Sequence, residues 1–225
     1  MKIGIIGTGM VARAHAAKLT ELGHEVTVGT RDVKKTLASA EKDAMGNPPF
    51  SEWHKDRANV KLAAFAEAAA RGEIVISALK GEAEISVLRP LSRELGGKVL
   101  IDISNPLDFS KGMPPSLTVC NTDSLGEQVQ RALPDVKVVK MFNTMNAYLQ
   151  VNPKLLAGGE HDIFMCGNDA RAKTEASAIA AGYGWKSIID LGDITNARGT
   201  EMLLPIWVRL WGALKTPMFN FKIVK

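Results

Sequence analysis

A glycine turn near the amino terminus is the first stretch whose residue types and spacing could do chemistry. Gly7, Gly9 and Ala12 fit the pattern G-x-G-x-x-A, directly after an apolar run and at the start of a segment with helical periodicity. In this pattern the first glycine permits a tight turn, the second lets the backbone approach a pyrophosphate, and the alanine keeps the helix close to the strand. Free N–H groups and the helix dipole then favour the anion. The turn therefore predicts dinucleotide binding, and a glycine turn without a ligand is the alternative.

The end of the second apolar run indicates which dinucleotide is bound. An acidic residue about 20 positions after the turn would bind the ribose hydroxyls of NAD, but Thr30 and Arg31 stand there, followed by Lys34 and Lys35. A hydroxyl and a guanidinium can hold a 2′-phosphate, which a carboxylate would repel. We therefore predict NADP(H). Two alternatives stay open, that Asp32 takes the acidic role or that Arg31 is simply solvated, although strand alternation favours Asp32 as a helix cap.

Side chains that could transfer protons are scarce where catalysis would take place. A dehydrogenase acting on an alcohol needs a general acid or base beside the nicotinamide, at the carboxyl ends of the strands. Lys80 is the one candidate there, although a solvated surface lysine is the commoner alternative. We predict no catalytic side chain and no metal site. Hydride exchange with a flavin-like ring needs mainly orientation and exclusion of water. The histidines all lie elsewhere: His15, His24, His54 and His161.

Short apolar runs alternate with helix-period segments, which is typical of βαβ units. We expect an α/β protein with a Rossmann-type, doubly wound parallel sheet. Residues 1–145 would form the NADP-binding domain, and residues 146–225 a small, mainly helical part with the acceptor pocket and dimer contacts. The first helix should run from Met10 to Leu22, with Gly23 as its cap. Strands are expected near Lys2–Gly7, Glu25–Thr30, Asn59–Ala63, Glu73–Leu79, Lys98–Ile103, Val136–Met141, Asp162–Cys166 and Ser187–Leu191.

Two loops interrupt this rhythm. The segment Met45–Ala58 carries Phe50 and Trp53 and could be a lid, an interface, or a surface loop pinned by its own aromatic side chains. The second loop, Ser104–Ser116, follows an apolar strand at the edge of the sheet where ligands bind. We predict that Asn105 in this loop contacts the nicotinamide or the acceptor ring, with a turn asparagine as the alternative.

The composition excludes several classes of protein. The 225 residues are 46% hydrophobic, which suffices for a sizeable core, and the net charge of +4 is scattered. No basic tract suggests nucleic-acid binding. No signal peptide or run of ~18 apolar residues is seen, so we expect a cytoplasmic protein that binds no membrane. Cys120 and Cys166 form no C-x-x-C motif and are expected to be two buried thiols.

A late apolar segment, Glu201 to Trp211, bears on assembly. Trp207 and Trp211 are spaced i, i+4, so their indoles should meet on one side of a helix. Because such a patch would be a liability on a monomer, we predict a homodimer in which Met202 and Trp207 help to wall the acceptor pocket. The alternative is a core helix buried wholly against its own sheet.

Six stretches together resemble the NADPH-dependent deazaflavin (coenzyme F-420) reductase family and the cytoplasmic NADPH-binding domain of the STEAP metalloreductases. The resemblance covers nearly the whole chain, and the segment 45–58 departs from the compact deazaflavin enzymes. The stretches are Gly7-Thr-Gly-Met-Val-Ala12, Val28-Gly-Thr-Arg31, Asp102-Ile-Ser-Asn-Pro106, Val139-Lys-Met-Phe-Asn-Thr144, Met165-Cys-Gly-Asn-Asp169 and Ala197-Arg-Gly-Thr-Glu201.

The resemblance implies hydride transfer between NADP(H) and a flavin or deazaflavin as second substrate, usually by a dimer. It places Thr8, Gly9, Met10 and Val11 at the pyrophosphate. It places Thr30, Arg31 and Lys35 at the 2′-phosphate. The nicotinamide end would be formed by Ala78, Leu79, Asn105 and Ala147. Two other functions stay open, an imine or ketone reductase on the same scaffold and a non-catalytic NADP(H) sensor.

Overall fold

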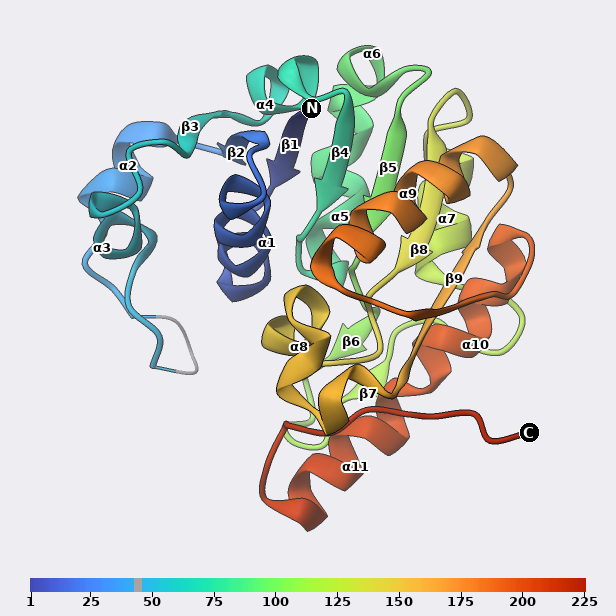
Figure 1. Ribbon diagram of the computed structural model, residues 1–225. Coiled ribbons are helices and arrows are strands. Elements are labelled where there is room, and N and C mark those ends of the chain that lie inside the picture. Colours follow the sequence, from blue (N-terminus) through green and yellow to red (C-terminus); the bar gives the residue numbers. More distant parts are fainter. Residues whose placement is uncertain (43–45) are drawn as a thin grey trace.

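The computed structural model describes residues 1–42 and 46–225, and its centre is one eight-stranded sheet (Figure 1). The strands lie in the order β10-β9-β8-β5-β4-β1-β2-β3. All eight predicted strands are present within a few residues, and the Rossmann-type α/β class is confirmed. Their bounds are β1 (Lys2–Ile6), β2 (Glu25–Thr30), β3 (Lys61–Ala64), β4 (Ile74–Ser77), β5 (Val99–Asp102), β8 (Lys137–Met141), β9 (Asp162–Gly167) and β10 (Ser187–Asp190).

Helices cover both faces of the sheet because strand side chains alternate between the two faces. Ile74 and Ile76 belong to the core beneath α1, α8 and α9, whereas Val75 belongs to the opposite core beneath α4 to α7. Figure 1 shows α1 and α9 in front of the sheet and α5 and α7 behind it. The helices are α1 (Met10–Glu21), α2 (Val33–Ala38), α3 (Phe50–Lys55), α4 (Phe65–Arg71), α5 (Gly81–Leu88), α6 (Ser92–Leu95), α7 (Leu125–Ala132), α8 (Ala147–Val151), α9 (Ala170–Tyr183), α10 (Ala197–Met202) and α11 (Leu204–Leu214), with 3₁₀ turns at Arg89–Leu91, Pro153–Leu155, Ala157–Gly159 and Ile194–Asn196.

Two strands, β9 and β10, run opposite to the others in the sheet that the sequence predicted to be parallel. β9 pairs antiparallel with β8, while β10 is parallel to β9. The connection from β8 to β9 contains only α8 and two 3₁₀ turns, so the chain does not cross back over the sheet before β9 begins. A strand that starts from the edge where its predecessor ended must run the opposite way.

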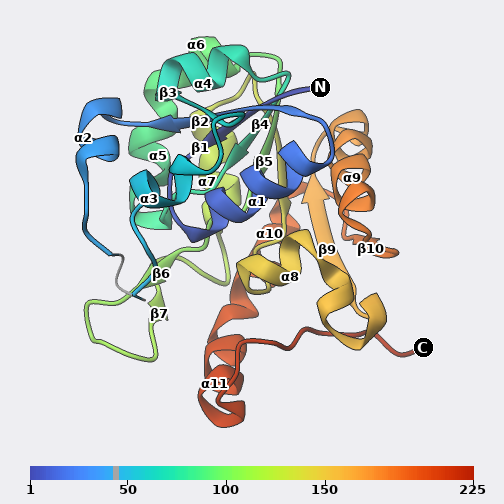
Figure 2. The same ribbon diagram turned by 60° about the vertical axis from the view of Figure 1, so that its left-hand side comes forward.

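The last two helices lie beyond the edge at which the parallel strands end, as both views show (Figure 2). Only Leu204 and Val208 of α11 are buried, so this helix is not buried wholly against its own sheet. The indoles of Trp207 and Trp211 do meet, with ring centroids 5.7 Å apart, as their spacing predicted. The chain then returns to β9, where the amide of Asp162 donates to the carbonyl of Phe221 at 3.0 Å.

The structure also shows where the two cysteines lie. Cys166 is buried, but Cys120 is exposed, because it follows a two-stranded hairpin, β6 (Leu107–Asp108) and β7 (Ser116–Leu117), that projects from the sheet edge. Within the described ranges, no helix is long and apolar enough to cross a membrane, and no cluster of His, Cys, Asp or Glu could hold a metal ion.

Candidate active site

The glycine turn lies between β1 and α1, and its two glycines are needed for different reasons. Gly7 has a φ of +119°, and a Cβ added there would lie 2.7 Å from the carbonyl oxygen of Ala78. Gly9 has an ordinary φ of −71°, and an added Cβ would meet no atom within 4 Å. The chain itself therefore does not require glycine at position 9, whereas a ligand approaching the start of α1 would. No side chain caps this helix end, which leaves its N–H groups to an anion.

A hollow of 420 Å³ lies at the carboxyl end of β2, where the 2′-phosphate was predicted. Asp32 also lines this hollow, and it caps α2 as strand alternation predicted, because its Oδ1 accepts a hydrogen bond from the amide of Lys35 at 2.9 Å. Sequence reasoning missed Arg13 and Lys42, two further cations that line the same hollow. Arg13 follows the glycine motif by one position, which is the signal that could have identified it. The predicted residues that the hollow brings together are Thr8, Gly9, Thr30, Arg31 and Lys35.

A smaller pocket of 140 Å³ lies at the carboxyl ends of β4, β5 and β8, which we call the ring pocket. It brings together three of the four residues predicted at the nicotinamide end. Ala147 is not among its lining residues; it is buried as the first residue of α8. Lys80 is exposed and does not line it. Its lining is Val11, Ala78, Leu79, Ile103, Asn105, Asn143, Met145, Gln150, Leu204 and Trp207.

Two residues of the ring pocket carry buried polar atoms without a partner. Asn105 and Asn143 bond reciprocally, since Asn105 Nδ2 donates to the Asn143 carbonyl at 2.8 Å and Asn143 Nδ2 donates to Asn105 Oδ1 at 3.0 Å. In the described part of the chain, neither Asn143 Oδ1 nor Trp207 Nε1 has a hydrogen-bond partner. Buried polar groups are rarely left unsatisfied. One acceptor and one donor at a small pocket without charged side chains fit the amide and carbonyl of a carboxamide, which nicotinamide carries.

The chain is similar to known proteins along almost its whole length. The model of the family NADP oxidoreductase coenzyme F420-dependent matches residues 2–106. The F420-dependent NADP reductase of Methanocaldococcus jannaschii is 31% identical over 218 residues, which cover 93% of this chain and 92% of that protein. This chain belongs to that family. It is therefore an NADP-dependent oxidoreductase.

Other members and relatives of the F420-dependent NADP reductase family extend this result. A crystal structure from Arthrobacter sp. FB24, assigned provisionally as an F420-dependent NADP reductase, has 55% identity and a TM-score of 0.95, with both chains fully covered. Metalloreductase STEAP3 of Rattus norvegicus is 30% identical over 211 residues, and the match spans 92% of this chain but only 38% of STEAP3. An imine reductase from Streptomyces aurantiacus, at 19% identity and a TM-score of 0.58, shares the fold.

Behind the ring pocket, this F420-dependent NADP reductase family member buries a charged cluster that sequence reasoning missed. Lys140 Nζ lies 2.9 Å from Asp102 Oδ2, 2.9 Å from Glu201 Oε1 and 2.7 Å from the carbonyl oxygen of Ser104. Burial lowers the pKa of Lys140, but the two carboxylates outweigh it and leave that pKa above its ordinary value. Burial and the nearby Asp102 raise the pKa of Glu84 to about 8. A lysine inside an apolar strand was the signal available in the sequence.

A second buried network lies under α1. His15 Nε2 donates to Gln150 Oε1 at 2.9 Å, and the Tyr183 hydroxyl donates to His15 Nδ1 at 3.0 Å. Burial lowers the pKa of His15 to about 4 and raises that of Tyr183 well above its ordinary value. Both groups therefore stay neutral near pH 7. Since Gln150 lines the ring pocket, this network helps to fix one of its walls.

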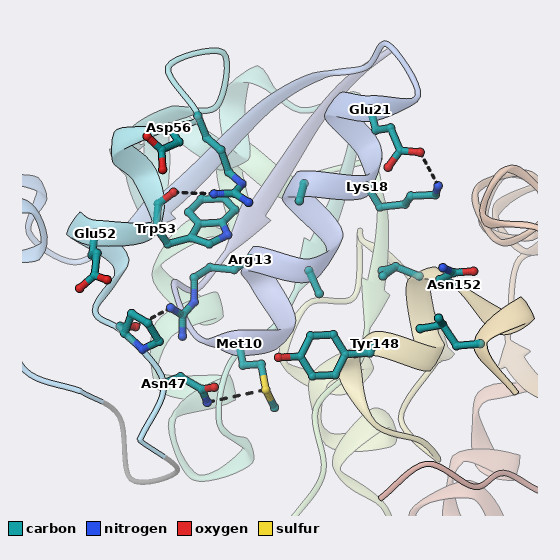
Figure 3. A pocket seen from close by; sticks show the side chains of 16 residues that line it. Met10, Arg13, Lys18, Glu21, Asn47, Glu52, Trp53, Asp56, Tyr148 and Asn152 are labelled. Carbon is teal, nitrogen blue, oxygen red and sulfur yellow. Dashed lines mark hydrogen bonds and ion pairs between the residues drawn. The ribbon is translucent and has the colours of Figure 1, made fainter.

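A groove of 610 Å³ runs along the outer side of α1, between α3 and α8 (Figure 3). Trp53 and Tyr148 stand on its two sides, and Met10 lines this groove rather than the hollow at β2 or the ring pocket. Arg13 donates to the carbonyl of Pro48 at 2.6 Å, and both residues also line the 2′-phosphate hollow. The segment 45–58, which the sequence predicted as a loop, thus contains a helix, α3, in its described part. The bond from Arg13 to Pro48 links this segment to α1. Met45 lies outside the described residues.

Proposed function

We propose that this chain transfers hydride between NADP(H) and a flavin or deazaflavin, with coenzyme F420 as the deazaflavin acceptor. The observation that carries this proposal is the lining of the ring pocket, which contains no titratable side chain among the described residues. Reduction of a carbonyl compound needs a proton donor beside the reacting carbon. Exchange between two aromatic ring systems needs alignment and a dry environment, which apolar walls supply.

Each part of the proposed site has its own task. The amides at the start of α1 would bind the pyrophosphate, and Arg31 with Lys35 would bind the 2′-phosphate. Asn143 Oδ1 would accept from the carboxamide nitrogen and Trp207 Nε1 would donate to the carboxamide oxygen, which satisfies both buried atoms. When bound, NADPH supplies the hydride. The chain would hold the nicotinamide in one orientation and keep water away from it.

The size of the ring pocket supports a position for the acceptor. Sites that enclose a drug-sized ligand have volumes of roughly 300–1,000 Å³, and the ring pocket has 140 Å³. It can therefore hold one ring but not two. The acceptor ring would lie across the mouth of the pocket, where α11 contributes Leu204 and Trp207.

Absorbance in the nicotinamide band tests the proposal directly. NADPH would be mixed with the protein and, in separate reactions, with F420, with flavin mononucleotide, with a cyclic imine and with a ketone. We expect rapid oxidation with F420 or the flavin and none above background with the imine or the ketone. Turnover only with the imine or the ketone would support a small-molecule reductase instead. Tight binding without turnover would support a sensor.

A further inference from the structure

The ring pocket has two walls that come from distant parts of the chain. One wall is the loop after β5, which carries Asn105, and the other is the corner between α10 and α11, which carries Leu204 and Trp207. We infer that Lys140 is a positioning residue that sets the separation of these walls, because its single ammonium group is bonded to both. The inference rests on the proposed function, since it concerns where the nicotinamide ring is held.

Lys140 and Asp102 together form four hydrogen bonds that hold the first wall. Lys140 Nζ donates to Asp102 Oδ2 at 2.9 Å and to the Ser104 carbonyl at 2.7 Å. Asp102 Oδ1 in turn accepts from the amide of Ser104 at 2.8 Å and from its hydroxyl at 2.6 Å. Two side chains thus hold the backbone directly before Asn105. The residue whose amide pairs with Asn143 at the pocket is therefore fixed from behind.

The bonds to the second wall pass through Glu201, which lies in α10 just before Leu204. Its Oε1 is 2.9 Å from Lys140 Nζ and accepts from the amide of Gly126 at 2.9 Å, and its Oε2 accepts from the amide of Leu125 at 2.8 Å. Those amides belong to the first turn of α7, where a carboxylate is also favoured by the helix dipole. Glu201 therefore joins the α10–α11 corner to both α7 and β8.

Stability alone does not explain such a cluster. Buried ion pairs often contribute less to stability than well-packed apolar residues of the same volume, because both charges lose their hydration. Directional hydrogen bonds, however, fix distances more closely than apolar contacts do. Hydride transfer is steeply sensitive to the separation of the reacting atoms. A cluster that holds two pocket walls at a set spacing would thus affect transfer more than nucleotide affinity, since the phosphates are bound elsewhere.

The test compares Glu201→Gln with Glu127→Gln. Glu127 also joins α7 to α10, through bonds to Arg198 at 2.8 and 2.6 Å, but it does not touch Lys140 or the loop after β5. For Glu201→Gln we expect turnover with F420 or flavin to fall at least tenfold while the Kd for NADPH changes less than threefold. The fluorescence of the bound nicotinamide, measured without any acceptor, should also change. Glu127→Gln should lose comparable thermal stability and keep wild-type turnover and fluorescence.

The outcomes separate this inference from the proposed function. A wild type that leaves NADPH fluorescence unchanged would refute the proposed function itself. Normal binding by the wild type, combined with wild-type turnover and fluorescence in Glu201→Gln, would refute only the role of Lys140. Equal losses in both variants would show a merely structural cluster. Asp102→Asn is the second variant; if it and Glu201→Gln both fail to fold while Glu127→Gln folds, the cluster is needed for folding and the inference falls.

Discussion

Arg31 stands exposed at the end of β2, on the rim of a hollow that also contains Lys35 and Arg13. The acidic residue that would select NAD is absent from this place, and Asp32 is occupied as the cap of α2. We predict that the choice of nucleotide depends on a few side chains around this hollow. His15, by contrast with the exposed Arg31, is a titratable side chain that is buried away from water.

Replacing Arg31 with alanine should weaken NADPH binding by about 1.5–3 kcal/mol, the range for hydrogen bonds to charged groups. NADH lacks the 2′-phosphate and should bind the variant almost as it binds the wild type. Titration of nucleotide fluorescence measures both affinities. Lys34→Ala is the matched control, since Lys34 is a neighbouring exposed cation that does not line the hollow. Equal losses for the two nucleotides in Arg31→Ala would contradict the assignment.

Acidification should destabilise the fold through His15. Between pH 6.5 and about 4 the unfolded chain protonates this side chain and the folded chain does not, so stability falls as pH falls, by about 3 kcal/mol over the window. Glu84 has the opposite effect, because its pKa is raised to about 8 in the folded chain. Stability therefore falls as the pH rises from the ordinary pKa of a glutamate toward 8. The free energy of unfolding should therefore be compared between wild type and His15→Gln. A pH-independent difference would show that His15 is not held neutral.

Elements position these side chains, and the loop after β5 is the element nearest the proposed chemistry. Its Asn105 donates to the backbone of Asn143 and accepts from its side chain. Asn105→Ala should lower turnover more than it weakens NADPH binding, because the ring pocket loses the paired hydrogen bonds between Asn105 and Asn143 while the phosphate contacts remain. Steady-state kinetics and nucleotide titration give the two numbers. Reduced stability with normal turnover would identify a turn asparagine instead.

The α3 segment has features of more than one of the roles that the sequence left open for residues 45–58, namely a lid, an interface or a surface loop held by its own aromatic side chains. Phe50 is buried and packs on Trp53 and His54, with centroids 5.2 and 5.4 Å away, so its own aromatics do hold it together. Phe50 also lines the 2′-phosphate hollow, whereas Trp53 lines only the α1 groove. Phe50→Ala should cost about 3–5 kcal/mol of stability and weaken NADPH binding. Trp53→Ala should lower the free energy of unfolding, measured with urea, without changing the affinity for NADPH. If Trp53→Ala weakens NADPH binding as much as Phe50→Ala does, Phe50 has no separate role in binding.

Assembly concerns the whole molecule. α11 leaves Ile206 and Leu214 exposed at 46% and 54%, next to Met202 at 40%, while Trp207 stacks on Phe219 with centroids 5.3 Å apart. Met202 does not line the ring pocket, although Trp207 does. We predict that this apolar surface packs against a second copy of the chain and closes the mouth of the ring pocket. The division of the chain at residue 145 also stays a prediction, since β9 and β10 extend the same sheet as the first half.

Sedimentation at micromolar concentration tests the dimer. The wild type should sediment as a dimer and Trp207→Glu as a folded monomer, because a buried carboxylate without a partner is strongly unfavourable at an apolar interface. Arg209→Glu, an exposed charge change on the same helix, serves as the control for helix stability. Wild-type protein that sediments as a monomer would contradict the prediction.

The sequence by itself determined the eight strands, the glycine turn, the helix cap at Asp32 and the preference for NADP. Each of these depends on residues a few positions apart, where alternation, turn chemistry and capping act locally. Only the tertiary structure decided the reversed direction of β9 and β10, the exposure of Cys120, and the meeting of Lys140 with Asp102 and Glu201. Those features arise from contacts between distant segments. Lys140 inside an apolar strand indicates burial in the sequence, but which carboxylates pair with it is decided by the packed fold.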